Sequence, residues 1–243
     1  MDIEELIETL KLHSDPWKRA EAALQLGDRG DDRVLEVLID KMQNDDHDFV
    51  RRDCAEALGL LEMKDAVEPL INCMLTDPFR YARNEAAESL GKLDDKKAIP
   101  ALLKTMKTDD WDFTRASAAL ALAEIDAHEV IGEILTSIVE EKESYIRKDM
   151  IKAVHKFRDV ESLPVLFELI SNDEDWEVRK QIALTLGWLA SPKTIEVLVS
   201  VLQRDPHLFV KQEAENSLQI IARDFKFQWT TAEAMLEAKE KFT

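Results

Sequence analysis

The sequence predicts an all-α fold, a right-handed α-solenoid (superhelix) of helix pairs with a 32-residue period. Three columns of residues predict it, because they recur at that interval without insertion or deletion. A basic residue recurs, an acid precedes it by six positions in six of seven units, and four of the six glycines follow it by eight positions. Self-similarity at a fixed period is typical of repeat architectures. The basic column is Arg19, Arg51, Arg83, Arg115, Arg147, Arg179 and Lys211.

Each unit contains two amphipathic helices, which we name helix A and helix B. In helix A, apolar residues follow the basic residue by four and seven positions, as Ala55 and Leu58 follow Arg51. In helix B, apolar residues recur at steps of three and four, beginning with Leu35 and Leu38 in the first unit. These spacings place the apolar residues on one face of a helix. The two helices of a unit therefore pack through their apolar faces.

The helix pairs predict a single continuous domain over residues 1–243. Residues 1–13 match a lone helix B and predict an N-terminal half-repeat cap, and residues 14–204 hold six full repeats. Residues 205–243 predict a degenerate C-terminal repeat and a polar capping helix from Thr231 to Phe242. Caps of this kind are expected because the terminal faces of a solenoid meet water.

Helix boundaries are indicated by acids, prolines and glycines. An acid before a proline predicts an N-cap followed by the first helical turn. The glycine column lies near the end of helix A, where it permits either close helix packing or a left-handed C-cap. The acid–proline pairs are Asp15-Pro16, Asp77-Pro78 and Asp205-Pro206.

Charge and composition exclude several classes of function. The 50 acidic and 32 basic residues give a net charge of −18, which disfavours binding to nucleic acid or to an anionic membrane. No apolar run approaches the ~20 residues of a membrane span. The acidic start, MDIEELIETLKL, is unlike a secretory signal, and we expect a cytoplasmic protein. We expect Cys54 and Cys73 to be small apolar core residues, the alternative being a redox pair.

The sequence predicts neither a metal site nor another cofactor. The five histidines, His13, His47, His128, His155 and His207, lie in distant repeats. A Gly-rich phosphate loop, a HExxH motif and a CxxC motif are all missing from the sequence. We therefore expect a protein that is not an enzyme and has no cofactor.

The repeats resemble HEAT repeats, specifically the short kind named after phycobilisome lyases. The resemblance rests on segments such as 45–52, DDHDFVRR, followed by 54–59, CAEALG, and it covers nearly the whole chain. It implies a solenoid with helix A on the convex side and helix B on the concave side. It also implies a ladder in which the acids and the basic column pair between neighbouring repeats. The acids are Asp45, Asp77, Asp109, Glu141, Asp173 and Asp205.

The resemblance is weaker for function than for fold. One relative, deoxyhypusine hydroxylase, holds iron through several His-Glu pairs, whereas this chain has only His128-Glu129. We expect a non-enzymatic scaffold or adaptor that binds a partner protein or peptide on its concave helix B surface. The alternatives are a bilin-lyase-like or chaperone-like accessory protein, acting on a chromophore-bearing or cofactor-bearing partner, and a structural assembly subunit.

The outward face of helix B predicts the position of the partner. In the later repeats this face carries valines where the middle repeats have polar residues, and apolar patches are candidates for interaction. The alternative is that Leu169 and Val201 are buried between adjacent B helices. The candidate residues are Val165, Glu168, Leu169, Val197, Val201 and Arg204.

An aromatic column stands two positions before the basic column. It indicates either a recognition edge, because aromatic residues anchor interfaces, or packing between one helix B and the next helix A. We favour the packing interpretation. The column is Trp17, Phe49, Tyr81, Phe113, Tyr145 and Phe209, with Trp176 one position off.

Overall fold

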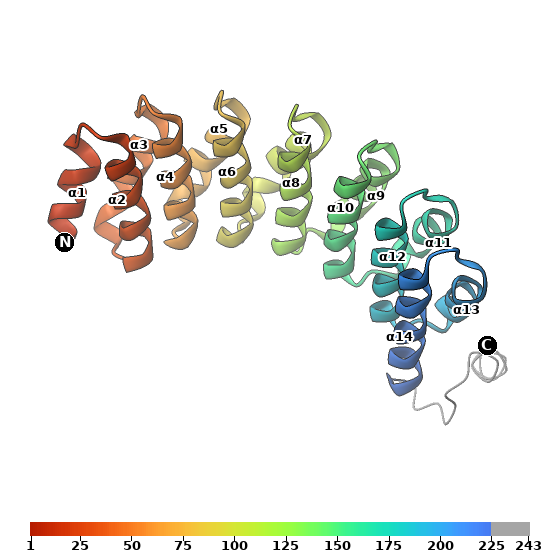
Figure 1. Ribbon diagram of the computed structural model, residues 1–243. Helices are drawn as coiled ribbons and strands as arrows, with labels where there is room; N and C mark the ends of the chain where they lie inside the picture. The colour runs from red at the N-terminus through yellow and green to blue at the C-terminus, as the bar shows by residue number, and fades with distance from the viewer. Residues whose placement is uncertain (225–243) are drawn as a thin grey trace. The chain divides into compact units, whose positions relative to one another are not determined.

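The structure, a computed structural model, describes residues 1–224, and all regular structure in that range is helical (Figure 1). The helices group into two compact units, divided between Ala127 and His128. The first unit contains α1 (Ile3–Leu12), α2 (Pro16–Arg29), α3 (Leu35–Asn44), α4 (Asp48–Leu60), α5 (Val67–Thr76), α6 (Arg80–Leu93), α7 (Ile99–Thr108) and α8 (Asp112–Glu124).

The second unit is built in the same way. Its helices are α9 (Ile131–Glu140), α10 (Ser144–Phe157), α11 (Leu163–Asn172), α12 (Trp176–Leu189), α13 (Ile195–Arg204) and α14 (Leu208–Asp224). Even-numbered helices are the predicted A helices and odd-numbered helices the B helices, so the predicted all-α arrangement of helix pairs is confirmed. The predicted capping helix, Thr231 to Phe242, lies outside the described residues.

The core of each unit lies between its A helices and its B helices. Leu58 of α4 and Leu70 of α5 are fully buried, as are Leu186 of α12 and Leu198 of α13. These residues occupy the apolar columns that define the 32-residue period. Periodicity in the sequence thus becomes one apolar layer in each unit, which is the main stabilising contribution to each helix pair.

A single turn of 3₁₀-helix precedes each B helix from α3 onward, where the sequence indicated only a polar turn. Asp31, Asp95, Asp159 and Ser191 each accept a hydrogen bond from the backbone N–H two residues later, which starts this turn. The six turns are Asp32–Val34, Lys64–Ala66, Lys96–Ala98, His128–Val130, Val160–Ser162 and Pro192–Thr194.

The acid–proline pairs do not all begin helices. Asp15 is the N-cap of α2, but α6 begins at Arg80 and α14 at Leu208, so the N-cap prediction is wrong for Asp77 and Asp205. Asp77 instead ends α5, and its Oδ1 accepts the N–H of Phe79 at 2.8 Å. The same side chain also binds an arginine of the preceding repeat, which fixes its position after helix B rather than at the start of helix A.

Glycines allow neighbouring A helices to pack closely. A Cβ atom at Gly27 of α2 would lie 2.7 Å from the Cα of Ala57 on α4, and one at Gly187 of α12 would lie 2.5 Å from the Cβ of Ser217 on α14. Real Cβ atoms do not approach so closely. The glycine column therefore serves helix packing. The left-handed residues occur three positions later, at Gly30 and Ala190 for example.

Candidate partner-binding surface

The regular 32-residue spacing of the acids and arginines produces a ladder of ion pairs. Arg51 Nε donates to Asp77 Oδ2 at 2.7 Å and its Nη2 donates to Oδ1 at 3.1 Å, so the guanidinium holds the carboxylate with two bonds. Its Nη1 donates to the backbone carbonyl of Asp45 at 3.0 Å. The same two-bond pairing joins Arg19 to Asp45, Arg83 to Asp109, Arg147 to Asp173 and Arg179 to Asp205.

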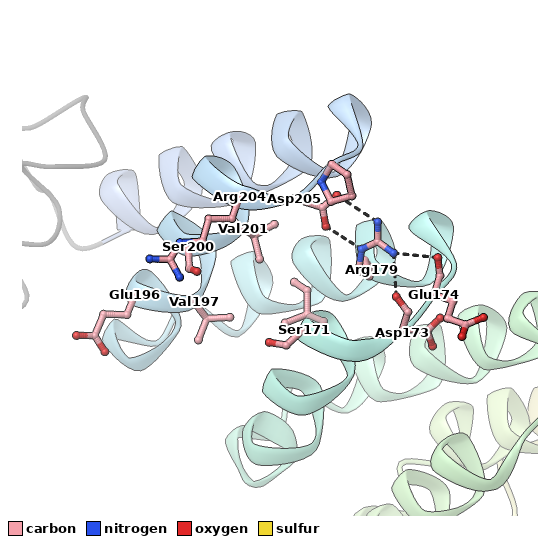
Figure 2. Close-up of a pocket in the computed structure, with 12 residues that line it drawn as sticks. Ser171, Asp173, Glu174, Arg179, Glu196, Val197, Ser200, Val201, Arg204 and Asp205 are labelled. Atoms are coloured by element: carbon pink, nitrogen blue, oxygen red, sulfur yellow. Dashed lines mark hydrogen bonds and ion pairs between the residues drawn. The ribbon is translucent and has the colours of Figure 1, made fainter.

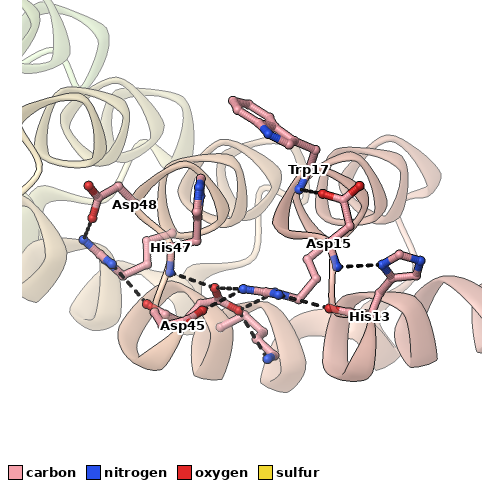
Figure 3. Close-up of polar contacts among 10 residues, drawn as sticks. His13, Asp15, Trp17, Asp45, His47 and Asp48 are labelled. Carbon is pink, nitrogen blue, oxygen red and sulfur yellow. Dashed lines mark hydrogen bonds and ion pairs between the residues drawn. The ribbon is translucent and has the colours of Figure 1, made fainter.

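Figure 3 shows the first part of this ladder, around Asp45. The paired side chains are nearly shielded from water, with 10% of Arg19 and 2% of Asp45 exposed. Burial alone would raise the pKa of the Asp45 carboxyl, but the Arg19 guanidinium and the His47 N–H outweigh burial and lower that pKa. The hydrogen bond from Arg19 to Asp45 raises the pKa of Arg19, which favours the charged form of the guanidinium. Both groups are therefore charged near neutral pH.

Within residues 1–224, a cleft of about 700 Å³ opens between α11 and α13 of the second unit (Figure 2). The apolar part of its wall is formed by Ile170, Val197 and Val201. One end of the cleft is formed by the ladder pair Arg179 and Asp205. Its other lining residues are Ser171, Asp173, Glu174, Glu196, Ser200, Arg204 and Pro206. Apolar wall with a few charged groups around it is typical of a site that binds part of another molecule.

The structure brings together only some of the candidate residues. Val197, Val201 and Arg204 line the cleft, with Arg204 exposed and Val201 buried at 8% exposure. Val165, Glu168 and Leu169 of α11 are not among its lining residues, although Val165 and Leu169 are half-buried and Glu168 is exposed. Sequence reasoning missed Ile170, Ser171, Glu174 and Glu196, because periodicity identifies a helix face but not how far neighbouring helices separate.

Equivalent clefts between B helices of the first unit are smaller. One of about 350 Å³ lies between α5 and α7, and another of about 380 Å³ lies between α3 and α5. The cleft between α5 and α7 is also more polar, because Thr105 occupies the position that Val201 has three repeats later. The cleft between α11 and α13 therefore differs from both counterparts in size, and from the one between α5 and α7 in chemistry as well.

Most rings of the aromatic column are exposed, which favours the recognition-edge interpretation over the packing interpretation. The rings contact one another and remain accessible: Trp17 is 59% exposed and Tyr81 is 41% exposed. A second ring column, two positions before the first, completes the contacts. It contains His47, Phe79 and Trp111 in the first unit and His207 in the second.

Other groups with reactive side chains are buried or dispersed. Cys54 and Cys73 are free thiols in the core, and burial raises the pKa of Cys73 to about 12, which makes its thiolate rare at neutral pH. The described part of the chain contains no group of three His, Cys, Asp or Glu side chains arranged to hold a metal ion. None of the helices within residues 1–224 has the length and hydrophobicity needed to cross a membrane.

Comparison with known proteins identifies the repeats. A CpcE–CpcF phycocyanin lyase complex from Nostoc has a chain with 22% identity and a TM-score of 0.58, covering 100% of this chain and 95% of that one. The YibA protein of E. coli has 19% sequence identity and a TM-score of 0.64, and the match covers 99% of this chain and 92% of that one. An archaeal HEAT-like repeats protein from Thermococcus onnurineus has 17% sequence identity and a TM-score of 0.54, and the match covers 92% of this chain and 98% of that one. These likenesses concern the fold alone. A comparison with curated proteins gave no match. The family of HEAT repeats matches residues 3–91, 39–123, 67–144 and 131–219, and the chain therefore belongs to the HEAT-repeat family.

Proposed function

We propose that this protein is a non-enzymatic scaffold that binds an apolar segment of a partner protein in the cleft between α11 and α13. The observation that carries the proposal is the cleft itself, which is larger than its counterparts in the first unit. Its wall also has Val201 where the cleft between α5 and α7 has Thr105. HEAT repeats form extended surfaces on which partner proteins bind. The resemblance to phycobilisome lyases implies that the B helices line the concave side, and the cleft lies between two B helices.

The lining residues suggest how the segment is held. Ile170, Val197 and Val201 provide the apolar contact, and burial of an apolar side chain against them is favourable by about 25 cal/mol per Å². Glu196 and Arg204 lie on α13 beside this wall, where they set the orientation of a partner through its charges. Arg179 is held by Asp205 and by the backbone carbonyls of Asp173 and Glu174, so it contributes a fixed end to the cleft.

The test is the substitution Val197→Glu, in the wall of the cleft. The Val197 side chain is half-buried, so we expect the helical circular dichroism to be retained while partner binding falls at least tenfold. Proteins that co-purify with the wild type are identified, and the binding of each purified candidate is then measured by calorimetry. Val160→Glu is the matched control, because Val160 is 54% exposed and lies outside the cleft. Normal folding with undiminished binding would exclude the cleft.

An accessory role toward a chromophore-bearing partner is the second candidate, which the resemblance to phycobilisome lyases suggests. It makes a different prediction, because a bound bilin or similar chromophore absorbs light above 300 nm. Protein purified with its partner and lacking such absorbance supports the scaffold, whereas stoichiometric absorbance supports the accessory role.

A further inference from the structure

Seven rings form a continuous aromatic ridge along the first unit. The ridge consists of Trp17, His47, Phe49, Phe79, Tyr81, Trp111 and Phe113. Successive ring centroids lie between 4.7 and 5.9 Å apart, with tilted or edge-to-face orientations. Trp17 and Phe113 are 59% and 46% exposed. Aromatic side chains placed in this way offer large rigid contact area at low entropic cost.

The ridge is distinct from the ladder beneath it. In Figure 3 the Trp17 indole projects away from the ion pairs around Asp45. The ladder accounts for the buried arginines and their acids, but it does not require exposed rings. Three exposed rings joined by four half-buried ones in unbroken contact across four repeats exceed the scattered apolar residues that are ordinary on a surface.

The chain itself demonstrates what the ring faces accept. The Arg52 guanidinium lies 4.9 Å from the centroid of Phe49, and that of Arg80 lies 5.2 Å from Tyr81 and 4.9 Å from Trp111. These distances are typical of cation–π contacts, in which a guanidinium is attracted to the face of an aromatic ring. Arginine side chains of a partner would be attracted by the same rings.

Charge around the ridge also favours a cationic partner. Asp15 and Asp48 are exposed close to Trp17 and Phe49 in the sequence. Asp46, Asp48 and Asp110 pair with ladder arginines but stay exposed, with 91% of the Asp46 side chain and 87% of the Asp110 side chain accessible. Arg52 and Arg80, on the ridge itself, offset part of this negative charge. The net charge of −18 opposes pairing of the ridge with a second copy of this chain. It equally opposes nucleic acid and anionic lipid, and it attracts a basic protein segment.

Spacing along the ridge indicates the conformation of that segment. Trp17 and Phe49 of successive repeats lie 5.2 Å apart, and Tyr81 and Trp111 lie 4.7 Å apart, so the rings leave no gap between repeats. A segment that contacts the rings of several repeats must therefore lie extended along the ridge. A polyproline II helix is extended and has no internal hydrogen bonds. Proline also packs well on aromatic rings and has little conformational entropy to lose.

We propose that the aromatic ridge binds an extended, proline-containing, basic segment of a partner protein. The prolines pack on the accessible rings, and the basic side chains reach the exposed carboxylates at Asp15, Asp46, Asp48 and Asp110. The indole N–H of Trp17, on an exposed side chain, is placed to donate to a backbone carbonyl of the segment. The ridge thus gives the protein a second binding surface with a chemistry opposite to that of the cleft.

The test is fluorescence anisotropy with a labelled peptide of four Pro-Pro-Arg repeats. Two other peptides separate charge from conformation: four Gly-Ser-Arg repeats keep the charge without proline, and four Pro-Pro-Glu repeats reverse it. We expect wild-type protein to bind the Pro-Pro-Arg peptide at least tenfold more tightly than either. Equal binding of the Gly-Ser-Arg peptide would reduce the effect to charge attraction and overturn the proposal, as would an absence of binding at 1 mM peptide.

Variants locate the binding on the ridge. Trp17→Ala with Tyr81→Ala should weaken binding at least tenfold, since both side chains are exposed and their loss leaves the core intact. Trp188→Ala is the matched control, because Trp188 is 45% exposed in the second unit, and it should change binding less than twofold. Equal effects of the ridge and control variants would overturn the assignment. Trp17→Ala alone repeats the test if circular dichroism reveals that the double variant is misfolded.

Discussion

Each ladder arginine joins three parts of the chain at once. Arg83 holds the Asp109 carboxylate of the next repeat by two hydrogen bonds of 2.8 and 3.0 Å, and it donates to the Asp77 carbonyl at the end of the preceding helix B at 3.1 Å. A planar guanidinium suits this geometry, whereas an ammonium offers a single point of charge. Within residues 1–224, Lys211, at the last position of the column, donates to the Gln203 carbonyl at 3.3 Å.

Removing one member of the ladder should therefore destabilise the fold. Arg83→Ala and Asp109→Ala each leave a nearly buried partner without its ion pair, and we expect each to lower the free energy of unfolding by about 1–3 kcal/mol. Urea and thermal unfolding measure the effect. Arg33→Ala is the control, because its ion pairs with Glu4 and Asp31 lie at the surface and surface pairs contribute little to stability. Unchanged melting temperatures in both ladder variants would refute the structural role of the ladder.

At the scale of helices, the glycine column determines how closely A helices approach. Gly59 of α4 faces Ser89 of α6, where an added Cβ would lie 2.3 Å from the serine Oγ and 3.0 Å from its Cα. Ser89 is fully buried, and its Oγ donates to the Ala55 carbonyl at 2.8 Å, so this side chain has no free space to move into. The close approach of α4 to α6 and the buried hydrogen bond from Ser89 to Ala55 therefore both require a residue without a Cβ atom at position 59.

Two glycine substitutions of identical chemistry should consequently have opposite effects. Gly27→Ala would force the Ala57 backbone away and should destabilise the protein by about 1–3 kcal/mol. Gly132→Ala, in α9, meets nothing within 4 Å and should stabilise it by about 0.5–1 kcal/mol, because alanine favours a helix. Both changes are measured as free energies of unfolding in urea. A loss of stability at both positions, or at neither, would contradict the packing role.

The helix pairs could be predicted from the sequence, because burial of an apolar face imposes a visible period on columns such as the one containing Leu58 and Leu90. The 3₁₀ turns could not be predicted, nor could the position of Asp77 at the end of α5. An acid beside a helix end has the same sequence signal whether it follows helix B or begins helix A. The cleft between α11 and α13 depends on the separation of two helices, which no periodicity encodes. The ridge was predicted in part, because only one of its two ring columns was considered.

At the scale of the whole molecule, the strict period makes neighbouring repeats interchangeable. The Arg83–Asp109 pair of α6 and α7 has the same form as the Arg51–Asp77 pair of α4 and α5. Gly91 of α6 faces Ala121 of α8 much as Gly59 faces Ser89. In repeat proteins each unit contacts only its neighbours, so stability is close to a sum of repeat and interface contributions. Removal of one whole repeat should therefore leave both kinds of contact available to the helices that become adjacent.

Deletion of residues 64–95 tests this property, because it removes α5 and α6 and joins Met63 to Lys96 with the period intact. Arg51 would then meet Asp109, and Gly59 would meet Ala121. We expect a cooperative helical protein whose urea m-value and free energy of unfolding are both lower, because less surface is buried. Deletion of residues 64–79 is the control: it removes α5 but keeps α6, so two A helices follow each other and the apolar face of α4 loses its partner. Circular dichroism and urea unfolding should separate the two variants. If both deletion variants fold equally well, the contacts between repeats do not depend on the 32-residue period, which contradicts the prediction.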